Sequence, residues 1–168
     1  SKCSGDRENL INELKKIEYF SMNGKKIDNK NISKLINLSE NHNVSELIDN
    51  CLAKNKKKII SILNENNFSN EDCILILRTL LIKAKRILKL QEEVKKNKTI
   101  DQVISNFKPP IFWKDKEIVK NQILKWKIKD IENLLFSLKD IELASKKHSA
   151  NSLNIIYDFI LNTAQPSN

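Results

Sequence analysis

The chain has 168 residues, of which 40% are hydrophobic and 30% are charged. This balance is typical of a globular domain with a buried core, and it excludes an intrinsically disordered chain. Only two glycines and three prolines are present, too few for the tight turns that a sheet of hairpins requires. The composition therefore predicts an all-α fold, a helical bundle.

The formal net charge of +9 favours an anionic partner, nucleic acid first. Lys, Asn and Ile are abundant together, a bias expected from a genome rich in A and T, so most lysines are interpreted as solvated surface residues. Only a cluster that combines basic and aromatic side chains counts as a sign of nucleic-acid binding.

The three cysteines, Cys3, Cys51 and Cys73, are odd in number and far apart. They form neither a disulfide framework nor a metal knuckle, so we expect a reducing, cytoplasmic location. No apolar stretch approaches the roughly 20 residues of a membrane span. Because the chain opens at Ser1 without an initiator Met, we expect a piece of a longer protein.

Apolar residues at three- and four-residue steps predict a helix over residues 6–21, which Asn23 and Gly24 end. Asp28 caps a second, short helix, so residues 1–41 are interpreted as a helix hairpin. The polar stretch 39–43 marks the boundary between this hairpin and a second domain.

The same periodicity predicts further helices after this boundary, as far as about residue 162, with eight or nine helices in the whole chain. The longest expected helix runs from Glu71 to about Asn97 and would be the centre of a bundle. Thr99 and Gln102 have capping-box spacing before a short helix that Pro109 and Pro110 end. The other helices are expected at about 44–52, 59–63, 115–126, 130–145 and 152–162.

No motif for catalysis, cofactor binding or metal binding stands out. Glycine occurs only at positions 5 and 24, so no glycine-rich phosphate loop exists. His42 and His148 have no ligand at metal-site spacing, and Cys51 and Cys73 are interpreted as buried small hydrophobes. Glu142 and Lys146 have the spacing of a surface ion pair. We therefore expect a binding or assembly module that is not an enzyme.

One segment combines charge with aromatic rings, from Phe107 through Lys116, and Lys120 lies just beyond it. Aromatic faces stack on unpaired bases while lysines follow phosphates, so Trp113, Lys114, Lys116 and Lys120 are candidate DNA-facing residues. The alternative is that Phe112 and Trp113 fill the core at an interhelix turn. Physical reasoning favours this alternative, because a Pro-Pro turn must bury something to be fixed.

Three stretches of the sequence together resemble one protein family. They are Gly5 to Lys16, Asn70 to Leu80, and Lys108-Pro-Pro-Ile-Phe-Trp-Lys-Asp-Lys116 followed by Gln122, Trp126 and Leu138 to Lys146. In their order and spacing they resemble the C-terminal region of the delta subunit of the bacterial DNA polymerase III clamp loader. The resemblance covers nearly the whole chain.

The resemblance implies a partial AAA+ lid at residues 1–41 and a helical collar, the oligomerisation domain, at 42–168. It implies assembly with the clamp-loader ATPase subunits and delta prime in a replisome near the nucleoid. The sliding clamp would be bound only by an N-terminal domain outside this chain, and primer-template DNA is a possible partner. The parent would be an accessory subunit of a DNA-directed DNA polymerase, without catalysis or cofactor here.

Arg7 falls where related lids place a nucleotide-sensing arginine, and we interpret it as structural. The alternative hypothesis is a stand-alone single-strand or primer-template DNA-binding module that uses the Trp113 segment.

Overall fold

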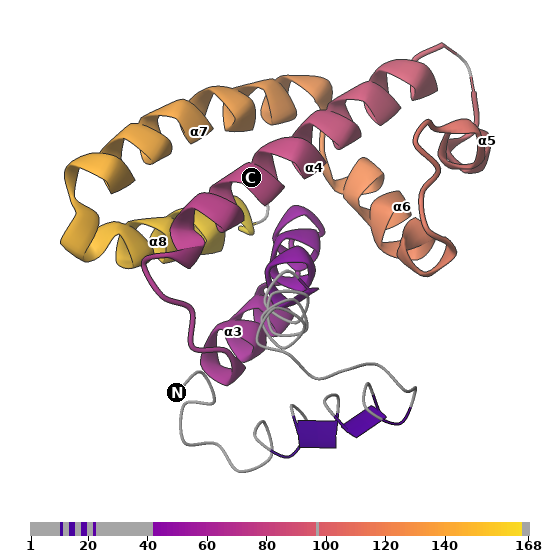
Figure 1. Cartoon of the computed structure of the whole chain (residues 1–168). Coiled ribbons are helices and arrows are strands. Elements are labelled where there is room, and N and C mark those ends of the chain that lie inside the picture. Colours follow the sequence, from indigo (N-terminus) through magenta and orange to yellow (C-terminus); the bar gives the residue numbers. More distant parts are fainter. Residues whose placement is uncertain are drawn as a thin grey trace. The chain divides into compact units, whose positions relative to one another are not determined.

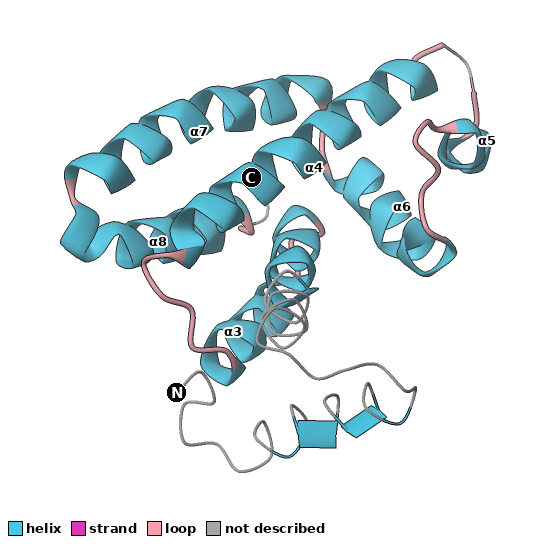
Figure 2. Cartoon of the chain, in the orientation of Figure 1, coloured by secondary structure: helices cyan, strands magenta, loops and turns pink. Residues whose placement is uncertain are grey.

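A computed structural model describes residues 42–96 and 98–165, together with Ile11, Leu14, Lys15, Glu18, Tyr19 and Met22. The chain divides into two compact units, residues 1–43 and 44–168. All regular structure among the described residues is helical, which confirms the all-α prediction (Figure 2). The remaining residues of the expected hairpin, Arg7 included, lie outside the described residues.

The second unit is organised around the 23-residue helix α4, Asp72–Val94. A helix at residues 42–52 and α3, Lys56–Glu65, precede it. Helices α7, Ile128–Lys147, and α8, Ser152–Thr163, pack on α4. Helices α5, Ile100–Asn106, and α6, Lys116–Lys125, pack on it nearer its C-terminal end (Figure 1). Helix α4 thus packs against α7 and α8 and also against α5 and α6, as expected for the central helix of a bundle.

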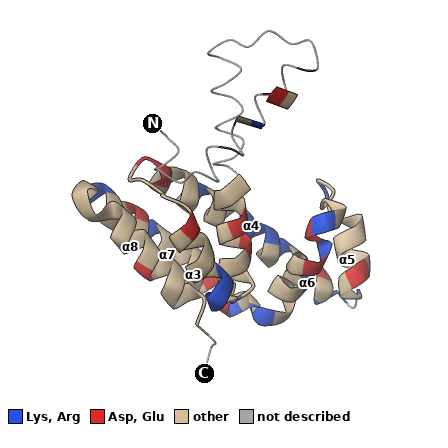
Figure 3. Cartoon of the chain, turned by 90° about the horizontal axis from the view of Figure 1, so that it is seen from below, with Lys and Arg blue, Asp and Glu red and all other residues tan. Residues whose placement is uncertain are grey.

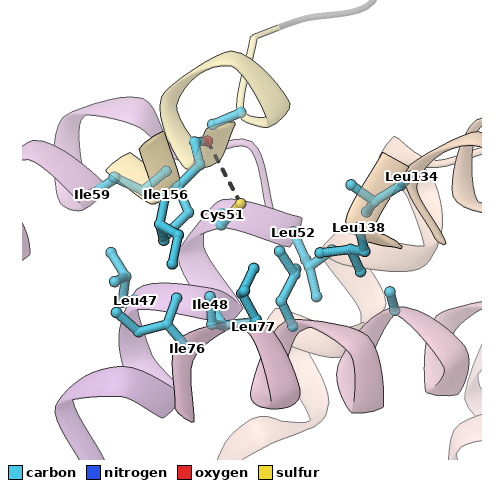
Figure 4. Close-up of a cluster of buried hydrophobic side chains, with 14 of the residues drawn as sticks. Leu47, Ile48, Cys51, Leu52, Ile59, Ile76, Leu77, Leu134, Leu138 and Ile156 are labelled. Carbon is cyan, nitrogen blue, oxygen red and sulfur yellow. Dashed lines mark hydrogen bonds between the residues drawn. The ribbon is translucent and has the colours of Figure 1, made fainter. Parts of the chain in front are cut away.

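The buried side chains form two separate apolar clusters. The larger joins residues of the 42–52 helix, α3, α4, α7 and α8, and several of them surround Cys51 (Figure 4). The smaller lies at the end of α4, where Leu90 packs with α5, α6 and Ile111. Each fully buried aliphatic side chain contributes about 1.5–3 kcal/mol, so both clusters are substantial.

Local sequence signals explain several helix ends. Thr99 accepts from the Gln102 backbone N–H, and the Gln102 side chain accepts from the Thr99 N–H, so the predicted capping box at α5 is confirmed. The 42–52 helix ends in a Schellman motif, in which Asn55 N–H donates to Asn50 O and Lys54 N–H to Cys51 O. Lys54 takes the left-handed position, with φ 56°, where glycine is usual.

Two further helices begin at residues that differ from the prediction. Helix α3 begins at Lys56, where Asn55 caps the Lys58 N–H, so the basic stretch before Ile59 is itself helical. Helix α7 begins at Ile128 rather than Asp130. Both differences arise because the sequence marks a helix start by its first apolar or capping residue, while the backbone already turns a few residues earlier.

Short connections join these helices, and η1 (Trp113–Asp115) and η2 (Ser149–Asn151) are two of them. At η2, Ser152 Oγ and the Leu153 N–H both donate to Asn70 Oδ1. Asn70 therefore caps the start of α8 from a distant part of the sequence. These two hydrogen bonds hold the N-terminal end of α8 against the loop that precedes α4.

Candidate nucleic-acid interface

The Pro-Pro turn exposes its two aromatic rings. After the cis Lys108–Pro109 peptide bond, Ile111 is buried in the smaller cluster. Phe112 is 57% and Trp113 68% exposed. The interpretation that Phe112 and Trp113 fill the core is therefore wrong, because the aliphatic Ile111 anchors the turn and directs the next two side chains outward.

The exposed rings and their neighbours make a mixed aromatic and basic surface. The ring centroids of Phe112 and Trp113 are 5.8 Å apart, at an interplanar angle of 47°. Lys114 Nζ lies 5.3 Å from the Trp113 centroid, within the range of a cation–π contact. Lys116 is exposed at the first position of α6. We call Phe112, Trp113, Lys114 and Lys116 the aromatic–basic surface.

Lys120 differs from the other candidates, because its charge already has a partner. Lys120 Nζ donates to Asp101 Oδ1 at 2.9 Å and Oδ2 at 3.1 Å. Asp101 raises the pKa of Lys120 through this hydrogen bond and its charge. The pair joins α6 to α5 on the surface, so Lys120 serves the packing of these two short helices.

Helix α6, whose first residue is Lys116 of the aromatic–basic surface, is held in place by a buried side-chain amide. Gln122 is fully buried. Its Nε2 donates to Asp49 O at 3.0 Å and to Asp49 Oδ1 at 3.1 Å. A buried amide donor with two acceptors fixes both position and rotation, so α6 has one register against the 42–52 helix.

Three more side-chain hydrogen bonds hold the C-terminal end of α6 and Trp126, the residue after it. The Trp126 indole N–H donates to Leu52 O at 2.6 Å, and Lys54 Nζ lies 4.6 Å from the Trp126 ring centroid. Gln91 Nε2 donates to the carbonyls of Ile123 and Trp126. Gln122 of α6 and Trp126 just after it thus both donate hydrogen bonds to the 42–52 helix.

Asp49 is the charged residue at the contact between the 42–52 helix, α4 and α6, which we call the Asp49 joint. Lys83 Nζ donates to Asp49 Oδ2, and Arg86 Nη2 lies 3.6 Å from Oδ1. The side chains of Asp49 and Lys83 are 12% and 13% exposed. Burial lowers the pKa of Lys83, against the opposing effect of Asp49. Among the residues that the structure describes, the buried Nε of Arg86 and the buried Oε1 of Gln122 have no hydrogen-bond partner.

The cysteine thiols found in the second unit are structural. Cys51 Sγ lies 3.7 Å from Ile160 O (Figure 4), and burial raises its pKa to about 12. A thiol with so high a pKa is not a nucleophile near neutral pH. Cys73 is also buried, beside Ser152 Oγ at 3.5 Å, which confirms the interpretation of both as buried small hydrophobes.

In the part of the chain that the structure describes, no three His, Cys, Asp or Glu side chains gather as metal ligands. Nor does any helix there have the length and apolar character needed to cross a membrane. Glu142 and Lys146 form the expected exposed ion pair, at 2.6 Å. The residues that the sequence did not single out are Asp49, Lys83 and Arg86, since charged residues on predicted helices give no signal of burial.

Comparison of the chain with models of protein families, with curated proteins and with solved structures found no match.

Proposed function

We propose that the chain is part of the delta subunit of a bacterial clamp loader and that its helical domain is a non-catalytic collar for assembly. The observation that carries this proposal is the order in which the family-like segments occur in the second unit. Asn70 to Leu80 opens α4, Lys108 to Lys116 leads into α6, and Leu138 to Lys146 lies in α7.

Two properties of the second unit support an assembly role. It is a bundle with two apolar clusters of its own. Large apolar side chains remain exposed on its long helix α7, namely Phe136 and Leu143. Exposed apolar residues rimmed by polar ones are a feature of protein interfaces.

The test is co-assembly. The chain is mixed with the clamp-loader ATPase subunits and delta prime and applied to size-exclusion chromatography. We expect it to elute within the complex. A second sample, Phe136→Asp with Leu143→Asp, changes only exposed positions and should co-elute less if α7 is an interface. Failure of the unaltered chain to elute with any of these subunits would refute the collar assignment.

A second function, binding of primer-template or single-stranded DNA, is favoured by the exposure of Phe112 and Trp113. The two rings offer faces for stacking, and Lys114 and Lys116 offer charge to phosphates. Stacking of one base on an aromatic ring contributes about 1–3 kcal/mol. Trp113→Ala is therefore expected to weaken binding about tenfold or more.

The two tryptophans make a fluorescence test specific, because Trp126 is buried and Trp113 is exposed. Titration with a primer-template should quench the Trp113 emission, and the quenching should weaken steeply with salt. Trp113→Phe, which keeps a ring for stacking, should remove the quenching signal while binding persists in an anisotropy assay. Absence of quenching at low salt would exclude Trp113 as a DNA contact.

A further inference from the structure

The long helix α4 exposes a continuous stripe that is both basic and apolar. It consists of Ile74, Arg78, Ile82, Lys85 and Lys89. At 100° per residue these positions lie within an arc of about 80° on the helix surface. Ile74 is 63% and Ile82 62% exposed, and the three cations are exposed as well. We call these five residues the α4 stripe.

The cations of the α4 stripe form no ion pair with a carboxylate of residues 42–96 and 98–165. The ion pairs of these ranges involve other cations, such as Lys83 and Lys96, and none involves Arg78, Lys85 or Lys89. Helix α4 itself has acidic residues only at its two ends. Figure 3 shows the basic residues along α4 toward α5 and α6. The α4 stripe therefore carries three positive charges beside two exposed isoleucines.

We propose that the α4 stripe binds an acidic amphipathic helix of a partner protein. Carboxylates on such a helix complement the three cations, which gives orientation and a fast encounter. Its apolar positions cover Ile74 and Ile82, which are eight residues or about 12 Å apart along α4. Two turns of a partner helix span nearly the same distance, so residues one heptad apart meet both isoleucines.

The two isoleucines distinguish this partner from a nucleic acid. Aliphatic side chains have no π face on which a base can stack, and the paired aromatic rings of Phe112 and Trp113 lie outside α4. Covering two exposed isoleucines with apolar side chains is favourable by the hydrophobic effect. The proposal goes beyond the assembly role and does not depend on the identity of the family.

The probe is a synthetic, fluorescently labelled peptide of about four helical turns, with Leu on one face and Glu on its flanks. Its binding to the full chain is followed by fluorescence anisotropy. A version with Lys in place of Glu tests the charge requirement. The chain is compared with Arg78→Glu/Lys85→Glu/Lys89→Glu and with Ile74→Asn/Ile82→Asn. The matched control is Phe136→Asn/Lys139→Glu, which changes an equally exposed apolar and basic pair on α7.

We expect the acidic peptide to bind and the Lys version not to bind. Charge reversal should weaken binding at least about tenfold, and the isoleucine variant should weaken it about threefold even at raised salt. The control variant should bind like the unaltered chain. Circular dichroism should show that each variant is folded, because all the positions are exposed.

Three results would overturn the proposal. The first is that the acidic peptide fails to bind at about 1 mM, and the second is that the α7 control loses as much affinity as the α4 variants. The third is that a single-stranded oligonucleotide displaces the peptide and that its binding depends on the three cations but not on the isoleucines, which would assign the stripe to nucleic acid. None of these results bears on co-elution with clamp-loader subunits, so the two proposals can fail separately.

Discussion

Replacing Asp49 by alanine removes the carboxylate that pairs with both Lys83 and Arg86. Two cations, 13% and 22% exposed in their side chains, then lack this counter-charge, and Gln122 loses one of its two acceptors. Breaking a buried ion pair from one side costs about 3–5 kcal/mol. Because water still reaches part of both cations, we expect the lower end, about 3 kcal/mol.

The assay is urea unfolding followed by far-ultraviolet circular dichroism, with the midpoint shifted and the slope unchanged. Asp49→Asn keeps the acceptor for Gln122 and should lose less stability than Asp49→Ala. Lys83→Met in the Asp49→Ala background should recover part of the loss, since one uncompensated cation is removed. The surface control is Glu142→Ala, which breaks an exposed pair and should change stability by less than about 0.5 kcal/mol. A loss for Asp49→Ala as small as that of the control would refute the idea that this carboxylate organises the joint.

Three further predictions concern single groups. Thr99→Ala removes the cap of α5 and should lower the unfolding free energy by about 1 kcal/mol. Thr99→Ser keeps the hydroxyl and should change the unfolding free energy very little. An equal loss for both variants would contradict the capping role. Cys51, with its pKa raised to about 12 by burial, should react with iodoacetamide only after unfolding, as read by peptide mass spectrometry, and modification of the folded chain would contradict this. Hydrogen bonds from Lys96 and Lys98 lower the pKa of Glu93 to about 2. The stability that this pairing contributes is therefore fully present above the ordinary pKa of 4.5, and it is lost as the pH falls toward 2. An NMR titration should show this pKa rising toward its ordinary value in Lys96→Met/Lys98→Met, and an unchanged titration would mean that the pairing does not form.

Helix type and order are predictable from the sequence because the apolar period is strong and breakers are few. The capping box at Thr99 depends on two residues that are three positions apart. Which apolar residue of a helix is buried depends on distant neighbours instead. On α4, Ile74 is exposed, while Ile76, two positions on, is fully buried.

The candidate site likewise depends on contacts between distant residues that the sequence does not predict. Composition singles out the segment around Trp113, yet it does not say that Ile111 turns inward and exposes the rings. Lys120 looks equivalent to Lys114 in sequence, but its partner Asp101 is 19 residues away. The Asp49 joint connects residues 73 positions apart, a distance at which one sequence carries no pairing signal.

The separation of the two apolar clusters has a consequence for how the domain opens. Helix α4 contributes Cys73 to Ile87 to the larger cluster and Leu90 to the smaller one. The smaller cluster is built from the short helices α5 and α6 and contains few fully buried side chains. The backbone amide protons of these two helices are therefore expected to exchange through local openings of low free energy. Amides in the middle of α4 and in α7 would exchange only through global unfolding. The two short helices on either side of Trp113, α5 and α6, would then be the first part of the domain to loosen.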